Sequence, residues 1–375
     1  MKKGFLVILL LIFLLPLNVH ATSNEDIESK LMDKFNFSEI DGMLQEIFPN
    51  EKLTFREILI DLLNGDIKFS FDLLKNVIID QVSYELRNSR SGMIHILILV
   101  IIAAIFNNFS SVFQSTQVAE ISFSMLYMLL LTVCLSNFRI LVNGASYNIE
   151  RLLEFMRLLG PVYFMAVAVA KGSASSIAFY QIVLMIIYLI EFVILNCILP
   201  MIQIYLMIKI LSELSPSIRL EKFAELIETV VMWILRVLLA GVIGLNVIQG
   251  LLSPAIDSVK RSILLKGGEA LPFIGKIVGG TSEVVIGTAV LIKNGIGVVG
   301  MIICAMISIA PLAQMTVVSL FYQLIAALIQ PISDKRMVEC VGSMSVGTRM
   351  LMRVIFTTGV LFLLTIAIVT STTGG

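Results

Sequence analysis

The chain has 375 residues, of which 58% are hydrophobic and only 14% are charged, and its formal net charge is zero. Soluble globular chains are about 45–50% apolar and about 25% charged, so this composition excludes an ordinary water-soluble fold. The apolar residues fall in runs of about 20 or more, the length that a helix needs to cross a hydrocarbon core about 30 Å thick. Composition therefore predicts an all-α, polytopic protein of the lipid bilayer. It gives no support to nucleic-acid binding, because basic clusters with interleaved aromatic residues are lacking.

The N-terminus predicts export. Two lysines precede the apolar run Phe5–Leu15, and small residues stand at the −3 and −1 positions of a cleavage site after Ala21. This pattern is typical of a cleaved secretory signal peptide, residues 1–21. The alternative is an uncleaved anchor helix. In both cases residues 22–90 are expected outside the cytoplasm.

The outer segment, residues 22–90, is acidic, with 14 of the 27 acidic and 8 of the 27 basic residues. Thr54 and Glu57 form a capping-box pattern that predicts a short amphipathic helix running to Leu63. Apolar residues about one turn apart predict a second helix at Phe71–Leu86. The segment is either a small extracytoplasmic helical domain or a set of amphipathic helices lying against the membrane surface or a partner.

Five apolar runs are candidates for membrane spans: Met93–Phe113, Ile121–Leu141, Ile177–Leu199, Val230–Val247 and Leu351–Val369. Two runs are too long for one span. These are Ile177–Leu211, which contains Pro200, and Gly295–Ile329, which contains Pro311.

The prolines indicate an internal tandem repeat. Pro200-Met-Ile-Gln203 matches Pro311-Leu-Ala-Gln314, and Pro161 matches Pro272, each at an offset of 111 residues. A short segment, too brief to span, is expected to begin at Pro161 and at Pro272. Short, interrupted apolar segments in two repeats are typical of transport folds, where the breaks line a pathway. The alternative is that Pro200 and Pro311 only turn a tight hairpin or kink a helix.

The repeat also suggests a division of the chain. Arg236 matches Arg353 at an offset of 117, which implies a short insertion. We therefore expect two transmembrane helices in residues 91–145, a first repeat unit in residues 146–255 and a second in residues 256–375.

Ionisable residues inside apolar runs default to a functional hypothesis because their burial in lipid is costly. They are His95, Glu191, Lys209, Arg236 and Lys293. Glu191 lies deepest, and with a partner such as Lys209 or Arg236 it either lines an aqueous path or fixes helix packing. His95, Lys209 and Lys293 stand near span ends, where snorkelling to the interface explains them.

No catalytic or cofactor site is expected, because hydrolytic motifs, a P-loop and metal-binding spacings are missing from the sequence. Gly295–Gly300 fits G-x-G-x-x-G, but it lies in an apolar run without an acidic residue 20 positions on, so it predicts a face for close helix packing. Gly241 and Gly244 are expected to serve the same purpose. Four cysteines are expected to be free packing residues: Cys134, Cys197, Cys304 and Cys340.

Taken together, the layout resembles a known family. A signal peptide and an acidic outer segment precede a polytopic region with Leu159-Gly-Pro161, Pro200-Met-Ile-Gln203 and the stretch from Leu220-Glu-Lys-Phe to Arg236. This arrangement is similar to the stage III sporulation protein AE family. The resemblance implies a role in endospore formation, in the mother-cell membrane around the engulfed forespore.

The resemblance also implies partners. They would be other stage III sporulation membrane proteins, including ring-forming and ATPase components, and a counterpart in the forespore membrane. The function we expect is a non-enzymatic subunit of a channel or secretion-like complex between mother cell and forespore. The alternative is a self-contained permease for a small solute.

Overall fold

The computed structural model describes residues 32–33, 35–48, 54–64, 116–171, 173–214, 220–268 and 279–372, and a few scattered positions from 75 to 105. For parts of these helices, among them 245–268 and 279–286, only the backbone is described. The predicted signal peptide, His95 and Pro272 lie outside the described residues, as do most of Phe71–Leu86 and Met93–Phe113.

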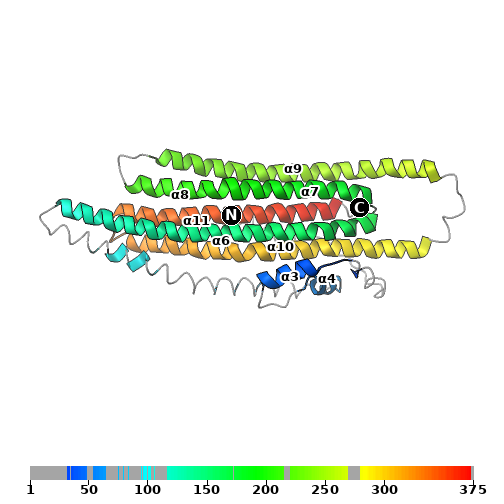
Figure 1. Cartoon of the computed structure of the whole chain (residues 1–375), viewed down its shortest axis with the longest axis horizontal. Coiled ribbons are helices and arrows are strands. Elements are labelled where there is room, and N and C mark those ends of the chain that lie inside the picture. The colour runs from blue at the N-terminus through cyan, green and yellow to red at the C-terminus, as the bar shows by residue number, and fades with distance from the viewer. Residues whose placement is uncertain are drawn as a thin grey trace.

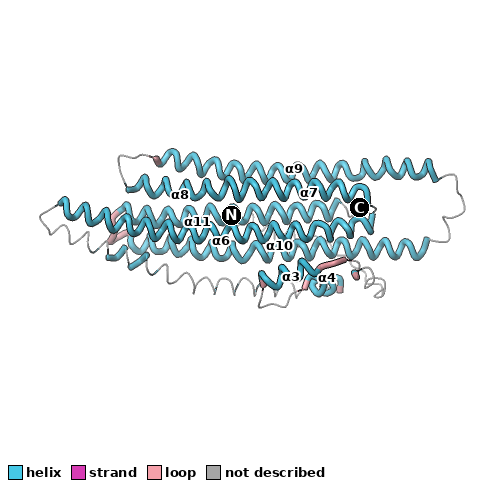
Figure 2. The backbone as a smooth tube through the Cα atoms, viewed as in Figure 1, coloured by secondary structure: helices cyan, strands magenta, loops and turns pink. Residues whose placement is uncertain are grey.

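In the described part of the chain, the long helices make up five rods. They form an up-and-down bundle in which successive rods alternate in direction (Figure 1). One rod combines three elements: α7 (Ser173–Val193), a π-helix η1 (Ile194–Ile198) and α8 (Leu199–Leu214). The other four are single helices: α6 (Thr116–Lys171), α9 (Glu221–Gly268), α10 (Gly279–Ile329) and α11 (Lys335–Thr372). Figure 2 shows helix throughout the rods, and no strand occurs in the described part of the chain.

The rods are much longer than a bilayer is thick. Within the residues that the structure describes, five helical stretches are long and apolar enough to cross a membrane: Ile121–Ala170, Tyr180–Ser212, Glu221–Gly244, Gly287–Ile329 and Lys335–Thr370. At 1.5 Å per residue, the 56 residues of α6 extend about 84 Å, against about 30 Å of hydrocarbon. The predicted spans inside the described residues are therefore confirmed as helices, but each is part of a longer rod.

The prolines do not interrupt these rods as predicted. Pro161 lies inside α6 and Pro311 inside α10, so the short segment expected to begin at Pro161 and the hairpin considered at Pro311 are both wrong. Proline removes a backbone donor and crowds the carbonyl of the preceding turn. At Pro200 this is accommodated by η1, where the Leu199 N–H donates to the Ile194 carbonyl five residues back. The interior of a bundle or bilayer offers no water to the other backbone N–H and C=O groups near a proline. Hydrogen bonds within the helix therefore remain the best available to them.

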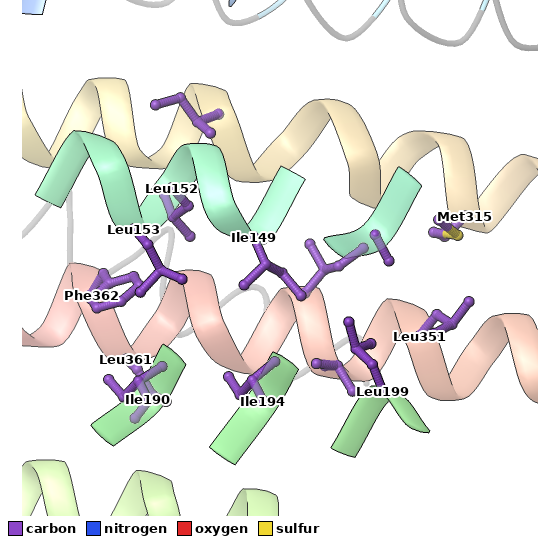
Figure 3. Close-up of a cluster of buried hydrophobic side chains, with 14 of the residues drawn as sticks. Ile149, Leu152, Leu153, Ile190, Ile194, Leu199, Met315, Leu351, Leu361 and Phe362 are labelled. Atoms are coloured by element: carbon purple, nitrogen blue, oxygen red, sulfur yellow. The ribbon is translucent and has the colours of Figure 1, made fainter. Parts of the chain in front are cut away.

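The centre of the bundle is α11, which contacts α6, α8, α9 and α10. Figure 3 shows buried side chains from three rods converging: Ile149, Leu152 and Leu153 of α6, Ile190, Ile194 and Leu199 of the α7–η1–α8 rod, and Leu361 and Phe362 of α11. Burial takes these apolar side chains out of contact with water or lipid. Their close packing fixes the register of the rods relative to one another. The domain boundaries expected after residues 145 and 255 fall inside α6 and α9. The internal duplication stays a prediction, because the helices of any up-and-down bundle alternate in direction whether or not the sequence is duplicated.

Two short helices of the outer segment lie beside the bundle, α3 (Ser38–Ile47) and α4 (Phe55–Leu63) (Figure 1). The predicted capping box is confirmed, because the Glu57 N–H donates to the Thr54 hydroxyl at 3.2 Å and α4 ends at Leu63. The Phe55 N–H donates to Asp41 Oδ1 at 2.6 Å, which joins the two helices. The α3 helix packs on α6 and α4 packs on α10, so this segment is attached to the chain's own bundle.

The glycine motif at 295–300 brings three elements together. A methyl group at its first, second and last positions would collide with Leu59 of α4, Thr370 of α11 and Leu159 of α6, respectively. For Leu159 the separation would be 2.6 Å. The predicted role in close helix packing is therefore confirmed.

The same prediction is wrong for Gly241 and Gly244 of α9. A methyl group at either position would meet nothing within 4 Å, and both residues are exposed. Small residues alone do not show which face of a helix is covered, because an outer helix such as α9 has neighbours on one side only. All four cysteines are free, as predicted, and Cys134 forms a thiol contact with Cys340 of α11.

Candidate functional site

The candidate site is an ion pair between α6 and α7. Glu191 of α7 binds Arg157 of α6, and the Arg157 guanidinium lies over the ring of Tyr188 at 5.0 Å from its centroid. The side chains of Arg157 and Glu191 are 36% and 29% exposed. The Arg157 Nε is buried and has no hydrogen-bond acceptor. The pair therefore sits at the edge of the bundle, with about two thirds of each side chain covered by protein.

Glu191 has a different partner from those predicted. Lys209 and Arg236 were expected, but Lys209 lies 18 residues further along the same rod and Arg236 is exposed on α9. The helices α6 and α7 form an antiparallel pair about residue 172, so positions equally distant from it lie opposite each other. Arg157 and Glu191 are 15 and 19 positions from it, which is one helical turn away from directly opposite and within reach of their long side chains.

Helix contacts give the depth of this pair in the bundle. Gly300 abuts Leu159, and Gly297 abuts Thr370, so Arg157 is level with the last third of α11. Residues 354–372 of α11 contain no charged side chain, and 19 residues of helix are about the thickness of a hydrocarbon core. Arg157 and Glu191 thus lie near the middle of the stretch of α11 best suited to lipid.

Further charges continue along α6 at this depth. Arg151 binds Glu46 of α3 and also Glu154 at 3.0 Å, and its Nε donates to the Tyr147 hydroxyl at 3.1 Å. Glu150 and Glu154 are exposed. We call this set, Glu150, Arg151, Glu154, Arg157 and Glu191, the charged face. Only Glu191 was singled out from the sequence, because the others fall between apolar runs and look like a loop.

The other predicted site residues are dispersed. Pro161 lies one turn beyond Arg157 in α6, whereas Pro200 and Pro311 belong to other rods. Lys293 is completely buried inside the bundle, so the expected snorkelling to the interface is wrong for this residue. It lies in α10 two residues before Gly295, where α4 covers the helix. Among the described residues, no cluster of three metal-ligating side chains occurs.

Comparison with known proteins identifies the family. The profile of stage III sporulation protein AE matches residues 53–373, from α4 to the end of α11. The chain belongs to this family. A similar curated protein is stage III sporulation protein AE of Bacillus subtilis (strain 168), which is 22% identical over 312 residues, 83% of this chain and 78% of the relative. No solved structure matches the chain.

The expected family is therefore confirmed, and with it a role in sporulation. The helices that could cross a membrane make the chain a multi-pass membrane protein of a sporulation family. The matched region begins just before α4 and leaves out α3, so α4 and its contact with Gly295 fall within the family profile.

Proposed function

We propose that this protein is a non-enzymatic membrane subunit of a multiprotein channel between mother cell and forespore, with its charged face lining an aqueous path. It lies in the mother-cell membrane, and residues 22–90 approach the bundle from the extracytoplasmic side, so that α3 packs beside α6 at the depth of Arg151. Its partners are ring-forming and ATPase components of the same complex and a counterpart in the forespore membrane.

The observation that carries the proposal is the depth of the Arg157–Glu191 pair. Its partly exposed side chains are level with the charge-free stretch of α11, and charged side chains in contact with lipid cost several kcal/mol. Such groups face protein or a water-filled space. The two acidic side chains of α6 beside it are exposed, so water is the surrounding that suits this face.

The neighbouring helices support the same assignment. The α3 helix stands next to α6, tied to it by Glu46, and it carries further acidic residues, Glu39 and Asp41. Lipid cannot solvate this side of the bundle at that depth. By contrast, the outer side of α9 exposes the large apolar side chains of Leu226, Trp233 and Val237, which lipid solvates well. The exposed Arg236 beside them has a long side chain that can reach the membrane interface. One side of the bundle is therefore suited to water and another to lipid.

The length of the rods supports a subunit of a larger assembly. Helices of 48 to 56 residues cover about 72 to 84 Å, so a large part of α6, α9 and α10 stands outside a hydrocarbon core of about 30 Å. Helical surface outside the membrane is available to partners on either side.

The test is affinity purification of the tagged, full-length protein from sporulating cells, followed by mass spectrometry. The proposal predicts recovery of other sporulation membrane proteins, and recovery of none would contradict it. A matched control is the same protein expressed in vegetative cells. The purified chain in liposomes tests the permease: transport of a solute by the chain alone, lost on Glu191→Gln, would replace the channel subunit by a self-contained carrier.

A further inference from the structure

A second group of charged residues lies on the central helix, away from the charged face. Arg349 and Arg353 of α11 are one turn apart and lie on the same partly exposed side of the helix. On that side the next turn presents Phe356, which is 39% exposed, and no charge follows to residue 372. This side of α11 therefore changes from basic to apolar at a single level.

The two guanidinium groups have few acceptors in the described part of the chain. Arg349 Nη1 donates to the Ser345 hydroxyl at 2.8 Å. Arg353 Nη1 has Met232 Sδ at 3.6 Å, a weak acceptor, and Glu228 Oε1 at 3.9 Å, beyond hydrogen-bond distance. Each guanidinium has five N–H donors, so most of the donors are left for another acceptor.

The group has an excess of positive charge. Arg353 faces the carboxylate of Glu228 in α9, and Tyr205 of α8 is close enough to interact electrostatically with both Glu228 and Arg349. Three helices thus surround a site with a net charge of one positive unit and a phenol nearby. An anion with several oxygen acceptors fits this arrangement, and arginine binds phosphate through paired N–H donors.

The position in the membrane specifies the kind of anion. The charge-free stretch 354–372 matches a hydrocarbon core, so the two arginines stand at its boundary, where lipid phosphates lie. The apolar side of α11 that begins at Phe356 offers a surface to acyl chains attached to such a phosphate. Basic groups between transmembrane helices at this level bind anionic lipid headgroups.

We propose that Arg349 and Arg353 bind the phosphate of an anionic phospholipid at the surface between α9 and α11. This side of the bundle then faces lipid, and the bound headgroup neutralises the arginines. The inference rests on the depth of α11 and holds whether or not the charged face lines a path.

The experiment is native mass spectrometry of the purified full-length protein with phosphatidylglycerol or phosphatidylcholine. Wild type is expected to bind phosphatidylglycerol at least tenfold more tightly than phosphatidylcholine, and the double variant Arg349→Gln/Arg353→Gln to lose most of this preference. Lys335→Gln is the control, because Lys335 is an exposed base of the same helix paired with Glu339. No preference in wild type, or an equal preference in the double variant, overturns the proposal.

Two further binding measurements test the same proposal. Glu228→Gln removes the carboxylate of the group and is expected to strengthen phosphatidylglycerol binding severalfold. If the arginine variants do not fold, unchanged or weaker binding by Glu228→Gln overturns the proposal. Inorganic phosphate at millimolar concentration is expected to leave lipid binding unchanged. Full competition by phosphate would assign the site to a free anion and contradict the lipid.

Discussion

Arg157 and Glu191 form an ion pair between α6 and α7, level with the centre of the charge-free stretch of α11. The two residues are 34 positions apart in the sequence, so it is the packing of the helices that brings them together. The pair does two things at once. It ties the first two rods of the bundle together, and it puts a charged, partly exposed surface at a depth where lipid is unsuitable.

Breaking this pair should destabilise the bundle more than removing it. Arg157→Gln or Glu191→Gln alone leaves an unpaired charge and is expected to cost about 1–3 kcal/mol, less than a fully buried pair because both side chains are partly exposed. The double substitution should recover most of the loss. The measurement is thermal unfolding in detergent, treated as a double-mutant cycle. Additive losses would show that the two residues do not interact.

A side chain at Gly347 of α11 should lower the stability of the bundle. A methyl group there would lie 2.8 Å from Phe138 Cε2 and 3.3 Å from Leu206 Cδ1, both in the packed core. Gly347→Ala is expected to lower stability by about 1 kcal/mol net of the helix propensity gained. Gly342→Ala in the same helix is the control, because nothing lies within 4 Å, and it should be neutral or stabilising. Equal melting temperatures for the two variants would contradict the packing.

Arg151 should hold α3 on the bundle. It binds Glu46 of α3 and its side chain is largely buried. Arg151→Gln is expected to raise hydrogen–deuterium exchange in α3 severalfold, with little change in α11. The control is Arg56→Gln, which removes only an exposed ion pair with Asp33 in the same segment. Unchanged exchange in α3 for Arg151→Gln would mean that apolar contacts alone attach it.

The contact between α3 and α4 should depend on pH. Burial raises the pKa of Asp41 above its ordinary value, and the nearby Glu57 adds to the effect, although the hydrogen bond from the Phe55 N–H opposes it. The folded segment therefore keeps this proton to higher pH than the unfolded chain. Its stability is fully present below the ordinary carboxyl pKa and falls as pH rises through the raised pKa.

Asp41→Asn removes this dependence while keeping an oxygen acceptor for the Phe55 N–H. The variant should show higher amide protection in α4 than wild type at neutral pH, and no decline between pH 3 and pH 7. Protection factors from hydrogen exchange provide the measurement. Glu39→Gln, an exposed change in the same helix, is the control and should retain the wild-type decline. A steeper decline of protection with pH for Asp41→Asn than for wild type would contradict the predicted direction of the pH effect.

Local patterns in the sequence were sufficient for some elements. The capping box at Thr54 predicts the start of α4, and apolar runs predict the location of the spans, because both depend on residues within a turn or two. The family was recognisable from the order of such features. The predicted effect of Pro161 and Pro311 was wrong, because neighbouring turns and rods keep each helix continuous past its proline.

The charged face could not be read from the sequence in the same way. Its partners come from three helices, and their register depends on where the chain turns after Lys171 and on how α3 docks. The partner of Glu191 and the burial of Lys293 are consequences of packing between rods. A periodic pattern specifies which face of a helix is apolar, but it does not identify the helix that covers it.

The central claim is that the charged face meets water at hydrocarbon depth, and cysteine labelling tests it most directly. Glu154 and Val237 are exposed at about the same level of the bundle, on α6 and α9 respectively. In membranes of sporulating cells, a membrane-impermeant maleimide should label Glu154→Cys well above the unsubstituted protein and leave Val237→Cys at background. Protection of Glu154→Cys, with or without labelling of Val237→Cys, would contradict the aqueous path.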